Sequence, residues 1–284
     1  MITVSALEPL RALVASARSS NHTIGFVPTM GALHEGHRSL VRISRRESSF
    51  TVVSIFVNPL QFGPGEDLAR YPRSPEEDAR SLEREGADAL YLPDAAAFYP
   101  PDFATAVEVS GVSEGGEGAR RPGHFRGVAT VVSKLFLQVQ PDLAVFGRKD
   151  LQQVAVVRRL VRDLDFPVRL VVGETVRESD GLAMSSRNAY LSPEERRKAP
   201  DLSRTLHAAR TRAGRGESDA SRLEEDAREQ LTAAGFEVDY VEAVEADTMR
   251  RVPVVSPGVA LAAAVKIGKT RLIDNVFLLD PREA

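Results

Sequence analysis

Two histidines in the stretch from Phe26 to His37 have a spacing that suits phosphate binding at the start of a helix. His34 and His37 lie three residues apart, so they share one face in helical geometry. The free backbone N–H groups of a helix start attract anions, a neighbouring glycine lets the backbone approach a ligand, and an imidazole can donate to a phosphate oxygen. We therefore expect this stretch to bind the phosphates of a nucleotide.

Two other interpretations of the histidine pair stay open. A zinc site would use both imidazoles as ligands, although the spacing of three differs from the spacing of four in the His-Glu-x-x-His motif. The pair can also be two solvent-exposed polar residues at a helix start, with no ligand at all.

Polar residues also follow two other apolar runs of the chain. The segment 58–63 follows one run, and Gly147–Asp150, with Gln153 one helical turn further on, follows the other. Ligands of an open parallel sheet bind at the carboxyl ends of its strands, so three such segments together indicate one site. We expect Lys149 to contact phosphate and Gln61 and Gln153 to act as neutral hydrogen-bonding groups. Taken singly, each of the three can also be an exposed surface residue.

A fourth polar segment, Met184-Ser185-Ser186-Arg187, follows the Asp180-Gly181 turn. Neither serine has the Gly-x-Ser-x-Gly context of a hydrolase nucleophile. We expect this loop to close over phosphates; the alternative is an ordinary linker between domains.

Placing these segments together requires an α/β fold. Near-continuous apolar runs indicate strands buried on both faces, at Thr23–Val27, Thr51–Val57, Asp88–Leu92, Leu143–Phe146 and Val168–Val172. Helical patterns lie between them, at Arg38–Arg46, Pro75–Glu85 (with Ser74 as its cap), Gly127–Gln140 and Leu151–Leu164. This alternation predicts a Rossmann-like, doubly wound parallel sheet over residues 1–174.

The last third predicts a smaller α+β domain over residues 175–284. Helical patterns begin near Ser192 and continue at Ser203–Ala213 and Ser218–Ala234, and three strand patterns follow at Val238–Ala243, Val259–Val265 and Arg271–Leu278. The domain boundary is expected near Gly173–Thr175. We expect the glycine-rich segment Ser110–Gly127 to be a mobile surface loop.

Composition excludes several kinds of site. The 284 residues include no cysteine, which rules out disulfides, thiolate metal sites and a cysteine nucleophile. Forty acidic and 37 basic residues give a net charge of −3, which argues against bulk binding to nucleic acid or membranes. No signal peptide is evident, and no apolar run approaches the roughly 18 residues that span a bilayer. We expect a soluble, cytoplasmic protein.

At this point the motifs resemble those of the pantoate–β-alanine ligase family. The matching blocks keep their order and spacing at Phe26–His37, Val57–Phe62, Tyr71–Arg73, Arg121–Val128, Lys149–Asp150 with Gln153, and Asp180–Asn188. The resemblance extends from about Ile24 to Asn275. A single His-x-Gly-His is shared by many nucleotidyltransferases, whereas the full set is much more specific. The family usually has Glu before the lysine of the third segment, where this chain has Arg148.

The resemblance implies an ATP-dependent condensation of pantoate with β-alanine that yields pantothenate, AMP and pyrophosphate. The reaction would proceed through a pantoyl-adenylate, with Mg²⁺ accompanying ATP. The resemblance also implies a homodimer, which we expect to form through the N-terminal domain. The C-terminal domain would then be free to close as a lid.

The resemblance assigns roles to individual residues. His34, His37 and Lys149 would be catalytic, with His37 as proton donor. The implied ATP-binding residues are Met30, Gly31, Ala32, Leu33, His34, Glu35, Gly36, His37, Gly147, Arg148, Lys149, Asp150, Val176, Met184, Ser185, Ser186 and Arg187. Gln61 and Gln153 would bind pantoate, whose carboxylate a negative side chain would repel.

Two other functions remain as alternatives. One is a different nucleotidyltransferase with the same His-x-Gly-His motif; the presence of both Gln61 and Gln153 favours the ligase. The other is a non-catalytic nucleotide- or RNA-binding protein on this fold. The net charge of −3 and an aromatic content of 6% weigh against RNA.

Overall fold

The computed structural model describes residues 1–280 and divides the chain into two compact units. The first comprises Met1–Val109, Arg121–Arg148 and Val156–Glu174. The second comprises Ser110–Arg120, Lys149–Ala155 and the chain from Thr175 onward. Two segments of the second unit, 110–120 and 149–155, lie within residues 1–174, the predicted N-terminal domain.

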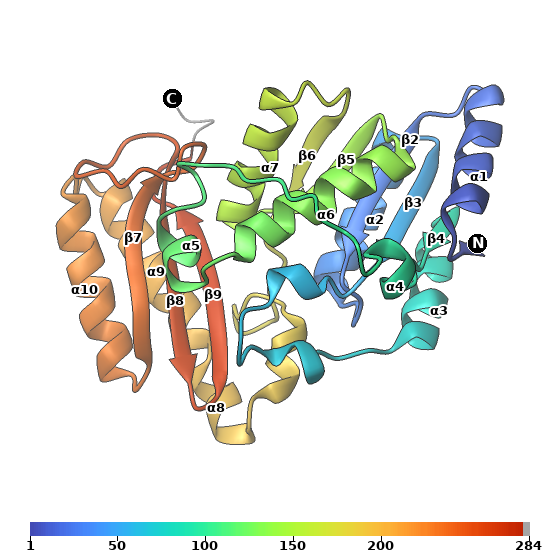
Figure 1. Ribbon diagram of the computed structural model, residues 1–284. Helices are drawn as coiled ribbons and strands as arrows, with labels where there is room; N and C mark the ends of the chain where they lie inside the picture. Colours follow the sequence, from blue (N-terminus) through green and yellow to red (C-terminus); the bar gives the residue numbers. More distant parts are fainter. Residues whose placement is uncertain (281–284) are drawn as a thin grey trace. The chain divides into compact units, whose positions relative to one another are not determined.

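The first unit is built on a parallel sheet of six strands in the order β1-β4-β3-β2-β5-β6 (Figure 1). The strands are β1 (Ile2–Val4), β2 (Ile24–Thr29), β3 (Phe50–Ile55), β4 (Ala89–Tyr91), β5 (Leu143–Gly147) and β6 (Arg169–Gly173). All five predicted strands are present, and the predicted doubly wound fold is confirmed. Strand β1 has only three residues, too few for a periodic signal in the sequence.

Helices cover both faces of this sheet. They are α1 (Leu7–Ser19), α2 (Glu35–Glu47), α3 (Pro75–Glu85), α4 (Ala95–Phe98), α6 (His124–Val139) and the part of α7 (Leu151–Asp163) that belongs to this unit. Val27 of β2 packs in a cluster with Leu40 of α2 and Leu82 of α3. Its neighbour Phe26 faces the other way, with its ring 6.4 Å from that of Phe136 in α6. Burial on both faces explains why the strands read as continuous apolar runs.

The second unit contains an antiparallel sheet of β7 (Glu237–Glu245), β8 (Val259–Ile267) and β9 (Thr270–Phe277). One face packs against α9 (Pro200–Gly214) and α10 (Ala220–Ala233), and α8 (Pro193–Lys198) precedes them. The other face packs against Leu151, at the start of α7. The predicted α+β architecture of the last third is thus confirmed.

The expectation of a mobile loop over Ser110–Gly127 is wrong for much of its length. Residues Gly116–Arg120 form helix α5, and α6 begins at His124. Glu117 in α5 is only 7% exposed and takes part in a buried polar network. The glycines of this segment weaken the local helix signal, and the helix is stabilised by contacts with distant parts of the second unit.

Helix α3 begins and ends at the predicted residues, but not because of the predicted cap. Ser74 occupies the position before the helix without a capping bond from its side chain. Its hydroxyl instead lies 3.5 Å from a carboxylate oxygen of Asp78.

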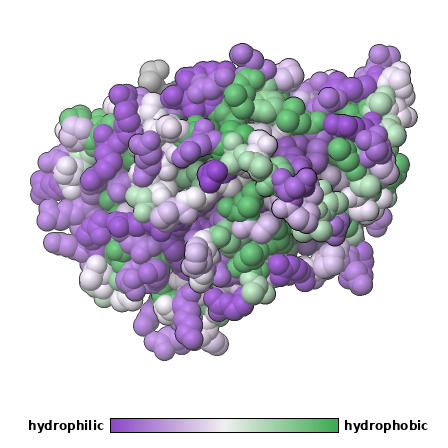
Figure 2. All heavy atoms as spheres, viewed as in Figure 1, coloured by the Kyte–Doolittle hydropathy of each residue, from purple (hydrophilic) through white to green (hydrophobic). Residues whose placement is uncertain are grey.

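The surface in the view of Figure 2 is mostly hydrophilic, with hydrophobic residues in small patches between polar ones. Within residues 1–280, none of the helices combines the length and the apolar character needed to cross a membrane.

Candidate active site

The strand order places β2 between β3 and β5, at the point where the direction of the chain connections reverses. All three strands are parallel, so their carboxyl ends lie at one edge of the sheet. The segments that leave this edge are those after Thr29, Ile55 and Gly147. Such a reversal point is where open α/β sheets bind ligands. The first two polar segments, and Arg148 at the start of the third, therefore share an edge as predicted.

His34 and His37 form a close pair of rings, tilted by 36° to one another, at the start of α2. His34 is the residue before the helix, and its Nδ1 accepts the backbone N–H of Gly36 at 3.1 Å. The Nδ1 of His37 accepts the N–H of His34 at 3.4 Å, and the two ring centroids are 4.1 Å apart. A neutral imidazole that accepts at Nδ1 carries its proton on Nε2. Each ring is thus oriented by the backbone so that Nε2 is the donor.

The turn that leads into the histidines is bent by a carboxylate from another helix. The backbone N–H groups of Ala32 and Leu33 donate to the two carboxylate oxygens of Asp78, at 2.9 and 2.8 Å. Ala32 has a φ of 51°, a conformation that is unfavourable for a residue with a Cβ. Gly31 has a φ of 87°, and a Cβ there would lie 3.0 Å from Ile55. Sequence reasoning assigned Asp78 no role in the site, because nothing local indicates its partners.

Glu35, an expected ATP-binding residue, uses its side chain within α2. It accepts from Arg38 at 2.9 Å and also pairs with Arg42. Burial alone would raise the pKa of Glu35, but the hydrogen bonds and charges of Arg42 and Arg38 hold it below its ordinary value. What Glu35 can offer an anion is therefore its backbone N–H in the first turn of the helix.

Gln61 is buried and held in one orientation by its neighbours. Its Oε1 accepts from the Nδ2 of Asn58 at 3.0 Å, while its Nε2 lies 3.1 Å from the sulfur of Met30. The Oδ1 of Asn58 accepts from the hydroxyl of Tyr99 at 3.1 Å, which fixes the Asn58 amide in turn. The chain of donors runs from Tyr99 through Asn58 to Gln61, whose N–H₂ group in turn donates to the sulfur of Met30.

Asn58 and Tyr99 belong to the site without having been assigned roles from the sequence. The side-chain N–H₂ of Asn58 also donates to the carbonyl of Gly127 at 3.1 Å. A Cβ at position 127 would lie 2.1 Å from the carbonyl oxygen of Leu60, so only glycine allows α6 to approach this closely. Asn58 could have been singled out as a polar residue after an apolar strand, whereas nothing in the sequence links Tyr99 to it.

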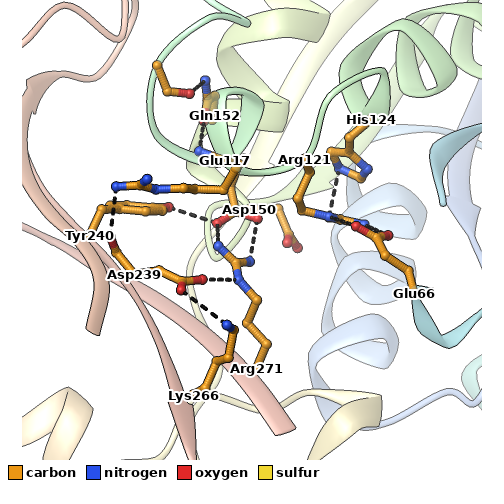
Figure 3. A network of polar contacts seen from close by, with 12 residues as sticks. Glu66, Glu117, Arg121, His124, Asp150, Gln152, Asp239, Tyr240, Lys266 and Arg271 are labelled. Atoms are coloured by element: carbon orange, nitrogen blue, oxygen red, sulfur yellow. Dashed lines mark hydrogen bonds and ion pairs between the residues drawn. The ribbon is translucent and has the colours of Figure 1, made fainter. Parts of the chain in front are cut away.

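The backbone of Gln61 is anchored by His124 and Arg121, which are drawn at the right of Figure 3. His124 Nδ1 donates to the Gln61 carbonyl at 2.8 Å, and Arg121 donates to the same oxygen at 3.3 Å. Arg121 also forms a two-pronged ion pair with Glu66, at 2.8 and 2.7 Å. Burial would raise the pKa of Glu66, but the hydrogen bonds and charge of Arg121 hold it below its ordinary value of 4.5.

Arg148 occupies the position at which the family named in the sequence comparison of motifs usually has glutamate. Its positive charge is compensated by Glu174. Its guanidinium lies 2.7 and 2.8 Å from the two carboxylate oxygens of Glu174. Its backbone N–H donates to the carbonyl of Gly173 at 2.8 Å. The extra positive charge is therefore paired within the first unit.

Lys149, Asp150 and Gln153 belong to the second unit, at the start of α7. The Nζ of Lys149 lies 3.7 Å from Asp150, and its side chain is 19% exposed. The Lys149 carbonyl accepts from the Nδ2 of Asn275 at 2.9 Å. Gln153 is half-buried, and its side chain has no hydrogen-bond partner among residues 1–280. Lys149, predicted to hold phosphate, and Gln153, predicted to hold pantoate, thus lie one helical turn apart. The backbone at Lys149 is held by Asn275.

The segment that contains the other expected ATP-binding residues of this unit forms a tight hairpin. The N–H of Met184 donates to the carbonyl of Val176 at 3.0 Å, and Arg177 pairs with Ala183. Ser185 accepts the N–H of Arg187 at 3.2 Å, which starts a short 3₁₀ helix over Ser186–Tyr190. The structure therefore brings Val176 and Met184 side by side, as a shared role in one binding site would require.

The segment 110–120 is attached to the sheet of the second unit by a buried polar network around Glu117 (Figure 3). Both Nη groups of Arg271 donate to Glu117 at 2.7 Å, and the hydroxyl of Tyr240 donates to it at 3.0 Å. Gln152 accepts the backbone N–H of Glu117 at 2.9 Å. Sequence reasoning missed this network because its members are separated by up to 154 residues.

Across residues 1–280, no group of three or more His, Asp or Glu side chains is arranged to hold a metal ion. The first unit brings together Met30 with Gln61, and His34 with His37, on segments that leave the same edge of the sheet. The second unit separately brings together Lys149 with Gln153, and Val176 with the 184–187 loop.

Comparison with known proteins identifies relatives that match over almost the whole length. A family model described as pantoate-beta-alanine ligase matches residues 2–277. The pantothenate synthetase of Pseudomonas entomophila is 52% identical over 280 residues, which cover 98% of this chain and 98% of the relative. The pantothenate synthetase of Moorella thermoacetica is 49% identical over 279 residues, which cover 98% of this chain and 99% of the relative.

Solved structures give the same result. The pantothenate synthetase of Thermus thermophilus superposes with a TM-score of 0.93 at 50% identity, covering 98% of this chain and 99% of that one. The pantoate-beta-alanine ligase of Francisella tularensis superposes with a TM-score of 0.83 at 32% identity, covering 98% of each chain. That ligase was solved in complex with beta-gamma ATP and beta-alanine.

Replacing Glu66 by Gln should destabilise the folded protein above about pH 5 and have little effect in strong acid. Because the folded-state pKa of Glu66 is lowered from 4.5, its carboxylate stabilises the fold fully above that value and loses this effect as the pH falls through the lowered pKa. We expect a loss of about 1 kcal/mol in the free energy of unfolding at neutral pH.

Urea unfolding of wild type and Glu66→Gln at several pH values from about 3 to 7 would measure this difference. Glu77→Gln is the matched control, since Glu77 is exposed on α3. A Glu66→Gln difference that stays constant over the whole pH range would contradict the assignment.

Proposed function

Since the chain belongs to the pantoate–β-alanine ligase family, it is a ligase for these two substrates, and we propose that it works through a pantoyl-adenylate made from ATP. In the first step the pantoate carboxylate attacks the α-phosphorus of ATP and pyrophosphate leaves. In the second step the amine of β-alanine attacks the acyl carbon and AMP leaves. The complex of the Francisella relative with beta-gamma ATP and beta-alanine supports ATP and β-alanine as substrates.

The close pair of His34 and His37 at the start of α2 is the observation that carries this proposal. Negative charge builds up on the phosphate oxygens and the departing pyrophosphate as the carboxylate attacks, and donors fixed in advance stabilise it. Both imidazoles accept a backbone N–H at Nδ1, so each neutral ring carries its proton on Nε2. In this proposal His37 donates to the phosphates, and Lys149 and the Ser185–Arg187 loop supply further positive charge and hydrogen-bond donors.

Gln61 is suited to bind the pantoate carboxylate and hydroxyl groups. Its amide oxygen accepts from Asn58, while its amide nitrogen carries two N–H donors and contacts the weakly accepting sulfur of Met30, so we assign the nitrogen as the group that binds the ligand. A neutral donor can bind a carboxylate without the repulsion that a second carboxylate would cause. We assign Gln153 to the same substrate, because its side chain has no other partner in the described part of the second unit.

Mg²⁺ enters this scheme as part of the substrate, bound to the triphosphate of ATP. It would neutralise charge on the phosphates, while protein groups bind and orient them. The adenylate must be shielded from water until β-alanine arrives. We assign this shielding to the second unit acting as a lid, and we place the reaction in the cytoplasm, where ATP is available.

The carboxylate of pantoate, and not water, should be the nucleophile toward ATP. Pantoate labelled with ¹⁸O in its carboxylate should transfer one label to AMP, because the bridging oxygen leaves with the phosphate. Mass spectrometry of AMP and pantothenate after a single turnover would measure this transfer. Label found in pantothenate alone would refute the adenylate route.

His37→Ala and Lys149→Ala should each slow pyrophosphate release by about 100-fold or more, because each removes a donor fixed in advance. Both residues are only half-buried, so the melting temperature should change little. His22→Ala and Lys269→Ala are the matched controls, since both residues are exposed. Wild-type rates in rapid-quench experiments on either site variant would remove that residue from the mechanism.

We also propose a homodimer that forms through the first unit. Four large hydrophobic side chains of this unit are exposed by 44–59%, at Ile2, Leu60, Leu137 and Leu164. Sedimentation equilibrium of the full chain should give twice the mass of 30.9 kDa, and a glutamate at one or more of these positions should give monomers. Val254→Glu, at an exposed residue of the second unit, should leave the dimer intact. A monomeric wild type would contradict the proposal, and dissociation by Val254→Glu alone would move the contact to the second unit.

A further inference from the structure

Strand β9 carries polar side chains inside an apolar sheet. Asp274 is 3% exposed and Asn275 is 5% exposed, and Arg271 lies near the start of the strand. A buried polar group without a partner costs free energy, and a buried charge costs more. The partners of these three residues therefore show what the strand is built to hold.

Asn275 holds the backbone of Lys149. Its Nδ2 donates to the Lys149 carbonyl at 2.9 Å. Two residues after Lys149, the side chain of Leu151 packs in the apolar cluster on the same face of the sheet, beside Ile273 and Phe277. One hydrogen bond and one apolar contact thus fix the turn from which the Lys149 side chain projects.

Arg271 reaches the same turn by a second route. It pairs with Glu117 through two hydrogen bonds of 2.7 Å. The N–H of Glu117 donates to Gln152 in the first turn of α7 at 2.9 Å. In Figure 3, Arg271 lies between the carboxylates of Glu117 and Asp239. Arg271 and Asn275 have the same parity along the strand, so both point to the face that carries Leu151.

Asp274 points to the opposite face and holds the hairpin that precedes the 184–187 loop. Its two carboxylate oxygens accept from Arg177 at 2.6 and 3.0 Å. Arg177 also donates to the carbonyl of Gly181 at 3.2 Å, across the turn of that hairpin. The Asp274 side chain is 2% exposed and lies in the apolar core, so it depends on Arg177 for its charge to be compensated.

We propose that β9 is the positioning strand for the phosphates of ATP in the second unit. Asn275 sets the place of Lys149, and Asp274 sets the place of the Ser185–Arg187 loop. This inference rests on the proposed function, in which those two segments hold phosphates. Neighbouring residues of one hydrogen-bonded strand keep the two segments in fixed register, and an error of about 1 Å in such a register can cost about 100-fold in rate.

The test separates the two half-reactions of the enzyme. Asn275→Leu keeps the size of the side chain but cannot donate to Lys149. The β- and γ-phosphates are present only in the first half-reaction, so a loss of the donors that hold them should slow adenylate formation by about 10- to 100-fold. Pantothenate formation from synthetic pantoyl-adenylate and β-alanine should change by less than about threefold. A purely structural role would lower the rates of both half-reactions equally, and that result would overturn the inference.

Asp274→Asn should give the same split through the other segment, and it decides the question if Asn275→Leu does not fold. Glu224→Gln is the matched control, because Glu224 is a buried acceptor for Ala243 in β7 of the same sheet. It should not separate the two half-reactions.

Lys149→Ala in the same assay distinguishes the two levels of the argument. If Lys149→Ala slows adenylate formation and neither β9 variant does, the proposed function stands and the positioning role is wrong. If Lys149→Ala leaves adenylate formation unchanged, the phosphate role of Lys149 is wrong, and the positioning role assigned to Asn275 is wrong with it.

Discussion

The position of β2 between β3 and β5 determines where the first unit can bind a ligand. Chain connections leave the sheet in opposite directions from this point, so the carboxyl ends of these strands are not covered by a crossing helix. The chain must then turn sharply from β2 into α2, and it does so with positive φ angles at Gly31 and Ala32. The carboxylate of Asp78 compensates the two N–H groups that this turn exposes. The orientation of both histidines depends on that turn.

Several buried polar side chains among residues 1–280 bind backbone groups. Asn58, Asn275 and Asp78 are all at most 5% exposed, and each binds a backbone group next to a proposed site residue or in the same segment. A hydrogen bond to the backbone restrains the position of the segment itself. The rotamer of the functional side chain is then the remaining degree of freedom. Buried amides suit this task because they carry no charge that must be compensated. Asp78 and Asp274 are charged, and they receive two or more donors each.

The sequence predicted the features that arise from local patterns. The five parallel strands have near-continuous apolar runs, and helix α3 and the three C-terminal strands have local patterns of their own. All were found close to the predicted residues. The fold class follows from the alternation of these signals. The failures concern residues whose partners are distant in the chain. Helix α5 forms in a glycine-rich segment because Glu117 meets Arg271, 154 residues further on. Asp78 and Asn275 have no local signature either, because their hydrogen-bond partners are backbone groups that come near only in the folded chain.

Each unit fixes its own share of the proposed site by internal bonds. His34, His37 and Gln61 are held by Asp78, Asn58 and the backbone of the first unit, while Lys149 and the 184–187 loop are held through β9. Neither set needs the other in order to be correctly shaped. In the proposed reaction, the donors within each unit then need little reorganisation when ATP binds. Donors that are fixed in advance suit a reactive adenylate, because this intermediate has no covalent link to the enzyme and is held only by such contacts.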